Sequence, residues 1–177
     1  MNRESITLPA TVQPPPSRYT SRPFPPYRFV PGRAPHPRRH PDGHLYGAPE
    51  IEVATFDSAH WIFSETYLYG VDLYNHAYWW ECHEQWEALW KASADPQVAR
   101  FLQGLVQIAA ANLRRFMGSH DSGAKLAAKA CENLAIDEDY FLGIDVASFR
   151  QQVEEYFAGK RADFPLIELQ FPACDIR

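Results

Sequence analysis

Proline is spread very unevenly along this chain of 177 residues, and its distribution limits where regular structure can form. Twelve of the fifteen prolines lie in residues 1–49. Proline fixes φ and lacks a backbone N–H group, so this density excludes long helices and central strands. We therefore predict an extended arm over residues 1–49, a helical domain over 50–160, and an extended tail over 161–177 that packs on the domain.

The charge of the chain changes at the same boundary. Residues 1–49 hold seven arginines and only Glu4 and Asp42 as acids, so the arm carries a net charge of +5. Because the whole chain carries −5, residues 50–177 carry −10. The sequence therefore joins a basic arm to an acidic body.

Simple patterns also indicate the class and compartment of the protein. No apolar run approaches the roughly 20 residues of a membrane-spanning helix, and the first thirty residues lack the apolar segment of a secretion signal. The cysteines Cys82, Cys131 and Cys174 are odd in number and far apart, which favours free thiols in a reducing compartment. We therefore predict a cytoplasmic protein without membrane segments.

From residue 57 onward, apolar residues recur at three- and four-residue steps, as in amphipathic helices. Asp57 or Ser58 can cap the first helix, and the pair Asp95-Pro96 is a start signal for the third. Helices are predicted over residues 57–75, 78–93, 96–117, 122–135 and 146–158, with a tight turn at 75–77 and a connector at 136–144 that has room for a helical turn. The predicted fold class is an all-α, compact bundle of about five helices. The tail is expected to pack through Leu166, Ile167, Leu169 and Phe171.

The helix predicted over 96–117 is apolar around almost its whole circumference at its centre, which is typical of a buried central helix. Gln103 and Gln107 break this pattern and lie four residues apart on one face. Gly104 lies near that face and would allow another backbone to approach closely. Because a buried amide without partners costs about 1–3 kcal/mol, these glutamines need polar neighbours.

The stretch 71–91 offers such neighbours and carries the candidate chemistry. His83 and Glu87 lie four residues apart on one helical face, and Glu84 lies beside them. We expect a buried or half-buried polar cluster in which these three residues meet the two glutamines. The same helix carries the tryptophans that we expect to form the walls of this cluster, namely Trp79, Trp86 and Trp90.

Three interpretations of the cluster remain open. It can be a hydrogen-bonded core network that fixes how two helices dock. It can be a divalent-metal site with His83 and Glu87 as ligands and Glu84 or Glu81 adding oxygen, although the spacing matches neither His-Glu-x-x-His nor the Glu-x-x-His of di-iron bundles. It can also be a metal-free site for a small ligand or for acid–base chemistry, in which burial raises the pKa of a carboxylate.

The basic arm has alternatives of its own. Its arginines could bind nucleic acid, but the acidic body argues against that partner. The arm could be a solvated tail, which fits residues 1–22 best. It could instead fold back on the acidic body, which would bring Arg38, Arg39 or His44 close to the mouth of the cluster.

Three motifs in the central region resemble the domain of unknown function 309 family, whose members are small all-helical proteins. They are LYNHAYWWECHEQWEALWK at 73–91, FLQGLVQIAAANLRR at 101–115 and GAKLAAKACENL at 123–134. The lead-in PGRAPHPRRHPDGHLYG is similar to an extension of some members, and Cys82 stands where the family motif often has alanine. The resemblance covers roughly residues 56–135 and implies a helical fold but no reaction. Its motif positions are His83, Glu84, Glu87, Trp90, Gln103, Gly104 and Gln107.

Two functions of different classes follow from these observations. The first is a helical module without catalytic activity, whose cluster binds a small ligand or a protein partner or fixes helix docking. The second is a hydrolase-like enzyme that uses a divalent metal, with His83 and Glu87 as ligands and Glu84 as general base. The aromatic content also allows a homodimer.

Overall fold

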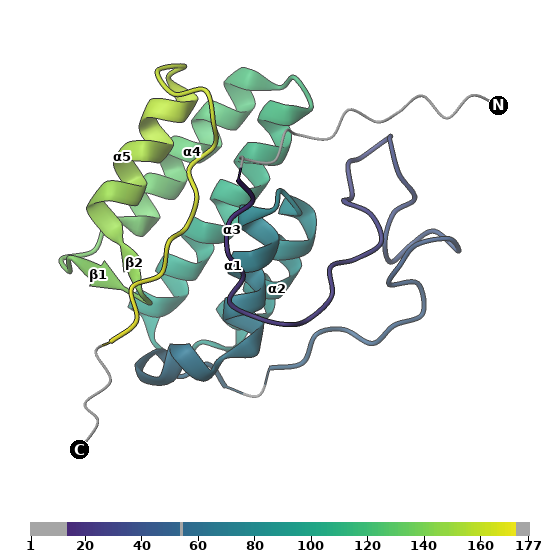
Figure 1. Cartoon of the computed structure of the whole chain (residues 1–177), viewed down its shortest axis with the longest axis horizontal. Helices are drawn as coiled ribbons and strands as arrows, with labels where there is room; N and C mark the ends of the chain where they lie inside the picture. Colours follow the sequence, from purple (N-terminus) through teal and green to yellow (C-terminus); the bar gives the residue numbers. More distant parts are fainter. Residues whose placement is uncertain (1–13, 54, 173–177) are drawn as a thin grey trace.

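Helices dominate the computed structural model, which describes residues 14–53 and 55–172. The elements are the 3₁₀-helix η1 (Ser58–Phe63), the helices α1 (Glu65–Asn75), α2 (Trp79–Ala92), α3 (Pro96–Phe116), α4 (His120–Leu134) and α5 (Val146–Phe157), and the two short strands β1 (Tyr140–Phe141) and β2 (Ile144–Asp145). The predicted all-α bundle is therefore confirmed (Figure 1). Predictions for residues 1–13 and 173–177, including a free thiol at Cys174, lie outside the described residues.

The segment predicted as one helix over 57–75 is divided in two. Asp57 caps η1 by accepting a hydrogen bond from the backbone N–H of Ala59 at 2.9 Å. Ser64 then leaves the helical conformation and caps α1, because its side chain accepts from the Tyr67 N–H. The predicted turn after α1 is confirmed, since Ala77 has a φ of 61°.

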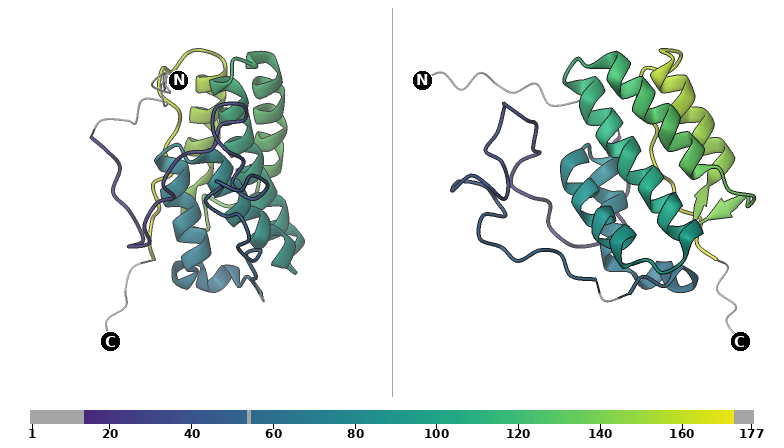
Figure 2. Two further views of the ribbon diagram at one scale, coloured as in Figure 1. Left: turned by 90° about the vertical axis from the view of Figure 1, so that its right-hand side faces the viewer. Right: turned by 180° about the vertical axis from the view of Figure 1, so that it is seen from behind.

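The buried helix α3 is the centre of the bundle and packs against both α2 and α4, as Figures 1 and 2 show. Asp95 caps it as predicted, by accepting from the N–H groups of Gln97 and Val98. A Cβ atom on Gly104 would lie 2.8 Å from the Leu134 side chain, so this glycine permits the close approach of α4. The second backbone expected at Gly104 is therefore that of α4.

The connector and the start of α4 differ from prediction. Residues 140–145 form an antiparallel hairpin rather than a helical turn, with Leu142 and Gly143 at φ values of 47° and 78°. The helix α4 begins at His120, two residues before its predicted start, and the hydroxyl of Ser122 accepts a hydrogen bond from Arg114 at 2.9 Å. The helix α5 begins at Val146, as predicted, and its N-cap is Asp145.

The two irregular ends of the chain lie along the helices. In Figure 1 the arm (purple to blue) passes in front of α1 and α2, and the tail (yellow) runs from α5 past α1. Ile167 and Leu169 of the tail are buried as expected, and Phe171, although 50 % exposed, lies with its ring centroid 5.2 Å from that of Trp61. The Leu169 N–H donates to the Tyr19 hydroxyl at 2.8 Å, so the arm and the tail also meet. Among the described residues, no helix is long and apolar enough to cross a membrane.

Candidate functional site

The helix α2 positions three side chains whose donor atoms converge. His83, Glu84 and Glu87 form the histidine–carboxylate cluster, in which one ligand atom from each lies within 4.8 Å of the others. The His83 Nδ1 atom lies 3.8 Å from Glu84 Oε1 and 3.9 Å from Glu87 Oε2. This Nδ1 is buried and has no hydrogen-bond partner among the described residues. These three residues of the predicted cluster therefore lie close together and half-buried.

The other carboxylate oxygens of the cluster are held by cations. Arg38 of the arm donates from Nε to Glu84 Oε2 at 3.2 Å. Lys91, one turn after Glu87 on α2, places Nζ 3.1 Å from Glu87 Oε1. Each carboxylate thus turns one oxygen to a cation and the other toward His83, which orients the inner oxygens. This contact agrees with the alternative in which the arm folds back on the body, for which Arg38 was one of the named residues.

The environment of Glu84 favours its ionised form. Burial acts to raise the pKa of this carboxyl, but the neighbouring His83 imidazole and the Arg38 guanidinium outweigh burial and lower the pKa. Glu84 is therefore a carboxylate at neutral pH. Such a group is suited to hold a cation and is poorly matched to a general base, whose pKa should lie near the working pH.

Gln103 and Gln107 do not complete the cluster as expected. The Gln107 side-chain oxygen accepts a hydrogen bond from Asn133 of α4 at 2.9 Å. Within residues 14–53 and 55–172, no hydrogen bond joins either glutamine to the three residues of the cluster. The physical reason is the close approach of α4 at Gly104, which brings an amide of that helix to the Gln107 side chain.

The tryptophans also have a different role from the one expected. Trp79 and Trp86 belong to the hydrophobic core, with exposed fractions of 3 % and 0 %, and Trp90 packs partly buried against it. Beside the cluster lies a hollow of about 140 Å³. None of these tryptophans lines it, so the expected aromatic walls are absent there; its lining consists of Arg38, Glu50, Ile51, Glu84, Glu87, Ala88 and Lys91.

Glu81, one turn before Glu84, faces the arm rather than the cluster. Its side chain is only 4 % exposed and accepts a hydrogen bond from the Phe29 N–H at 2.8 Å. The His44 Nε2 atom lies 3.9 Å away and is equally buried. Burial raises the pKa of Glu81 to about 7 although the Phe29 N–H opposes this shift, and burial lowers the pKa of His44.

The docking of the arm is expected to depend on pH through Glu81 and His44. The pKa of Glu81 rises from 4.5 to about 7 on docking, so its contribution is complete below pH 4.5 and is lost as the pH rises through about 7. The pKa of His44 falls below 6.5, so its contribution is lost as the pH falls through that lowered value. The NMR shift of the Phe29 amide, followed across this range, should report weaker docking above pH 7. An unchanged pH profile in Glu81→Gln would contradict this assignment.

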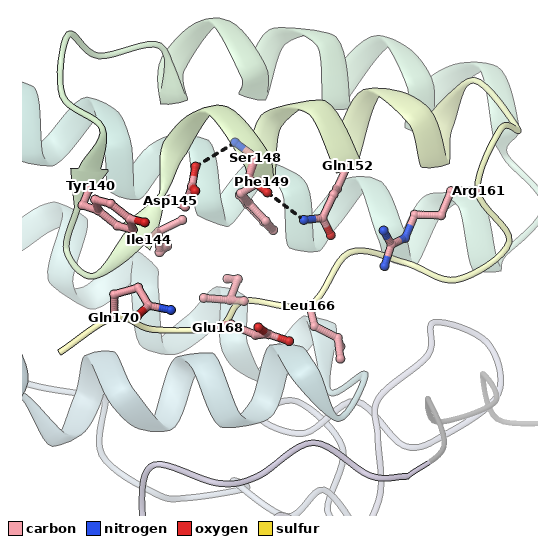
Figure 3. Close-up of a pocket in the computed structure, with 11 residues that line it drawn as sticks. Tyr140, Ile144, Asp145, Ser148, Phe149, Gln152, Arg161, Leu166, Glu168 and Gln170 are labelled. Carbon is pink, nitrogen blue, oxygen red and sulfur yellow. Dashed lines mark hydrogen bonds between the residues drawn. The ribbon is translucent and has the colours of Figure 1, made fainter.

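A second hollow, of about 240 Å³, lies between α5 and residues 161–170 (Figure 3). Three of its polar side chains are paired with one another or with the backbone: Asp145 accepts from the Ser148 N–H at 2.9 Å, and Gln152 donates to the Ser148 hydroxyl at 3.1 Å. No pattern in the sequence indicates this hollow, because it forms where the tail passes a distant helix. Its lining does not converge on one point as the histidine–carboxylate cluster does.

Comparison with known proteins agrees with the resemblance read from the motifs. Residues 67–126 match the family model of a domain of unknown function, DUF309. The DUF309 region spans about a third of the chain and includes the whole histidine–carboxylate cluster and both glutamines. No curated protein and no solved structure matches the chain. The DUF309 description names no reaction.

Proposed function

We propose that this protein binds a divalent metal ion through the histidine–carboxylate cluster of α2. The observation that carries the proposal is the convergence of His83 Nδ1, Glu84 Oε1 and Glu87 Oε2, with the imidazole nitrogen buried and unpaired among the described residues. Nitrogen and oxygen ligands bind such ions at about 2.0–2.2 Å, so two ligands of one ion lie roughly 3–4 Å apart. The separations of 3.8 and 3.9 Å fit this range.

The donor set indicates the kind of ion. One imidazole and two carboxylates suit zinc, manganese or ferrous iron better than calcium, which takes six to eight oxygen ligands. Three protein ligands leave at least one coordination position open to water. Arg38 and Lys91 hold the outer oxygens of the two carboxylates and would keep the inner oxygens in place, a role that typically contributes 10–100-fold to affinity.

The alternatives have less support. A core network that fixes helix docking needs bonds between helices, yet the cluster residues pair within α2 and with the arm. An organic ligand usually occupies about 300–1,000 Å³, and the hollow beside the cluster has about 140 Å³. A hydrolase with Glu84 as general base would need a raised pKa, and that pKa is lowered. The proposal is therefore metal binding without an assigned reaction.

Titration of the full-length protein with Zn²⁺ or Mn²⁺ in a calorimeter tests the proposal. His83→Ala and Glu87→Gln are each expected to weaken binding by at least about 100-fold, because each removes a direct ligand. Metal content after purification without chelator should be stoichiometric in the wild type and lost in His83→Ala.

The matched control is Glu132→Gln, which breaks an exposed lysine–glutamate pair on α4 and should leave metal affinity unchanged. If His83→Ala binds metal as tightly as the wild type, the proposal fails. If His83→Ala only lowers the free energy of unfolding, by roughly 1–3 kcal/mol, the imidazole has a structural role instead.

A further inference from the structure

The outer face of α1 and α2 holds an extended segment of the arm, residues 18–29, which has no helix or strand. In Figures 1 and 2 this segment (dark purple) runs past both helices. Carboxylates of the body accept hydrogen bonds from both ends of this segment. Asp72 of α1 accepts from the N–H groups of Tyr19 and Thr20 at 2.7 and 2.9 Å and from the Thr20 hydroxyl at 2.6 Å. Glu81 of α2 accepts from the Phe29 N–H.

Tyrosines hold the proline-rich middle of the segment. The Tyr69 hydroxyl donates to the Pro23 carbonyl at 2.8 Å, and the Tyr78 hydroxyl donates to the Pro25 carbonyl at 3.3 Å. Arginines of the segment cover the same two rings, with guanidinium carbons 4.4 Å from the Tyr69 centroid and 5.0 Å from the Tyr78 centroid. Aromatic hydroxyls that bind proline carbonyls of an extended chain are the means by which proline-rich ligands are recognised. The body thus presents a built site for an arginine- and proline-rich segment.

Most of the hydrophobic core lies within the body, although Phe29 and Val30 of the arm are also buried. The cluster of buried core residues begins at Phe56, and Tyr19 and Phe24 of the arm only pack against it partly buried. Residues 46–50, which connect the arm to the body, are all exposed. Gly47 in this connector has a φ of 72°, and no atom lies within 4 Å of the place that its Cβ would take. A change of direction here would break the hydrogen bonds from Arg38 to the Ala48 and Pro49 carbonyls, at 3.4 and 3.3 Å, and would displace no core residue. The arm can leave the face while the helices keep their packing.

We propose that the outer face of α1 and α2 is a recognition site for an arginine- and proline-rich segment and that it takes the arm of a second copy of this chain. An arm of charge +5 and a body of charge −10 attract one another whether or not they belong to one molecule. Exchange preserves every contact made by residues 18–29 and changes only the connector, which is the usual low-cost route to a dimer. This inference does not require that the histidine–carboxylate cluster binds a metal, although exchange would place Arg38 of one copy beside Glu84 of the other.

The arm of the same chain competes with this exchange. Tethering gives a segment an effective concentration of the order of millimolar at its own site. The wild type should therefore be mainly a closed monomer at low concentration. The exchange becomes measurable when the intramolecular contact is disabled.

Two full-length variants, each lacking one half of the contact, provide the test. Thr20→Pro combined with Arg22→Ala removes donors and a cation from the arm, and Asp72→Ala removes the acceptor on α1. Light scattering should find each variant monomeric. An equimolar mixture should contain a mixed dimer at tens of micromolar, because the intact arm of one variant can dock on the intact face of the other. High salt should reduce this dimer.

A labelled peptide of residues 17–32 separates recognition from dimer formation. It should bind the Thr20→Pro/Arg22→Ala chain at least tenfold more tightly than the wild type, whose own arm occupies the face. Adding Asp72→Ala should remove this binding, whereas adding Glu65→Gln, an exposed acid on the same helix, should not. Urea unfolding of each variant checks that it is folded.

Either part of the proposal can fail separately. If the peptide does not bind the folded Thr20→Pro/Arg22→Ala chain, the face is not a recognition site. If the peptide binds but the mixture stays monomeric, the face recognises arginine- and proline-rich segments. The claim that it takes the arm of a second copy is then wrong.

Discussion

Replacing Trp86 by alanine is expected to lower the free energy of unfolding by about 3–5 kcal/mol, the usual effect of deleting a large buried aromatic side chain. Trp86 is fully buried, its ring centroid lies 5.7 Å from that of Tyr74, and its indole N–H donates to the Tyr67 carbonyl at 3.5 Å. Urea denaturation followed by circular dichroism measures this loss. The indole joins α2 to α1, so the variant should also unfold at a lower temperature.

Gly70 and Trp80 provide matched tests of this assignment. A Cβ atom on Gly70 would overlap the Trp86 indole, so Gly70→Ala should also destabilise the protein although it deletes nothing. Trp80 belongs to the same helix but contacts Phe29 and His36 of the arm. Trp80→Ala should therefore cost less than Trp86→Ala. An equal or smaller loss for Trp86→Ala would contradict its place in the core.

Replacing Asn75 by alanine is expected to lower the free energy of unfolding by about 2–4 kcal/mol. The Asn75 amide donates to the Ile167 carbonyl and accepts from the Ile167 N–H, each at 2.8 Å. Both bonds are buried, and each backbone group left unpaired costs roughly 1–3 kcal/mol. Hydrogen exchange at the Ile167 amide, followed by NMR, should become faster than in the wild type by a factor of at least ten.

Asn133→Ala is the control for this prediction. Asn133 also makes an amide hydrogen bond, to Gln107 at 2.9 Å, but this bond is only partly buried. Its loss should cost about 0.5–1.5 kcal/mol, the net value of an ordinary hydrogen bond. If Asn75→Ala costs no more than Asn133→Ala, the buried pair with Ile167 does not hold the tail as argued.

Much of the helical pattern could be predicted because it depends on local rules. Asp95 followed by Pro96 marks a helix start in any context, and α3 begins at Pro96. The break at Ser64 was not predicted, because the apolar residues keep a helical period across it. Ser64 nevertheless acts as the N-cap of α1 and ends the preceding helix. The hairpin at 140–145 was missed because Leu142 has a positive φ, which branched apolar residues rarely adopt.

The candidate site could also be predicted only in part. His83, Glu84 and Glu87 lie within one turn and a half of a helix, so their spacing alone brings them together. The partners of Gln107 could not be predicted, because they depend on which helix approaches Gly104. The role of Asp72 as the hydrogen-bond acceptor for the arm could not be predicted, because an acidic residue on an amphipathic helix is usually solvated.

The sequence by itself determined the helices, the division between a basic arm and an acidic body, and the three convergent side chains of α2. Each depends on composition or on contacts between near neighbours along the chain. Only the tertiary structure decided that α4 supplies the partner of Gln107, and that Asp72 and Glu81 bind residues more than fifty positions away. Many helix arrangements satisfy the same local pattern, and close packing together with the pairing of buried polar groups selects one of them.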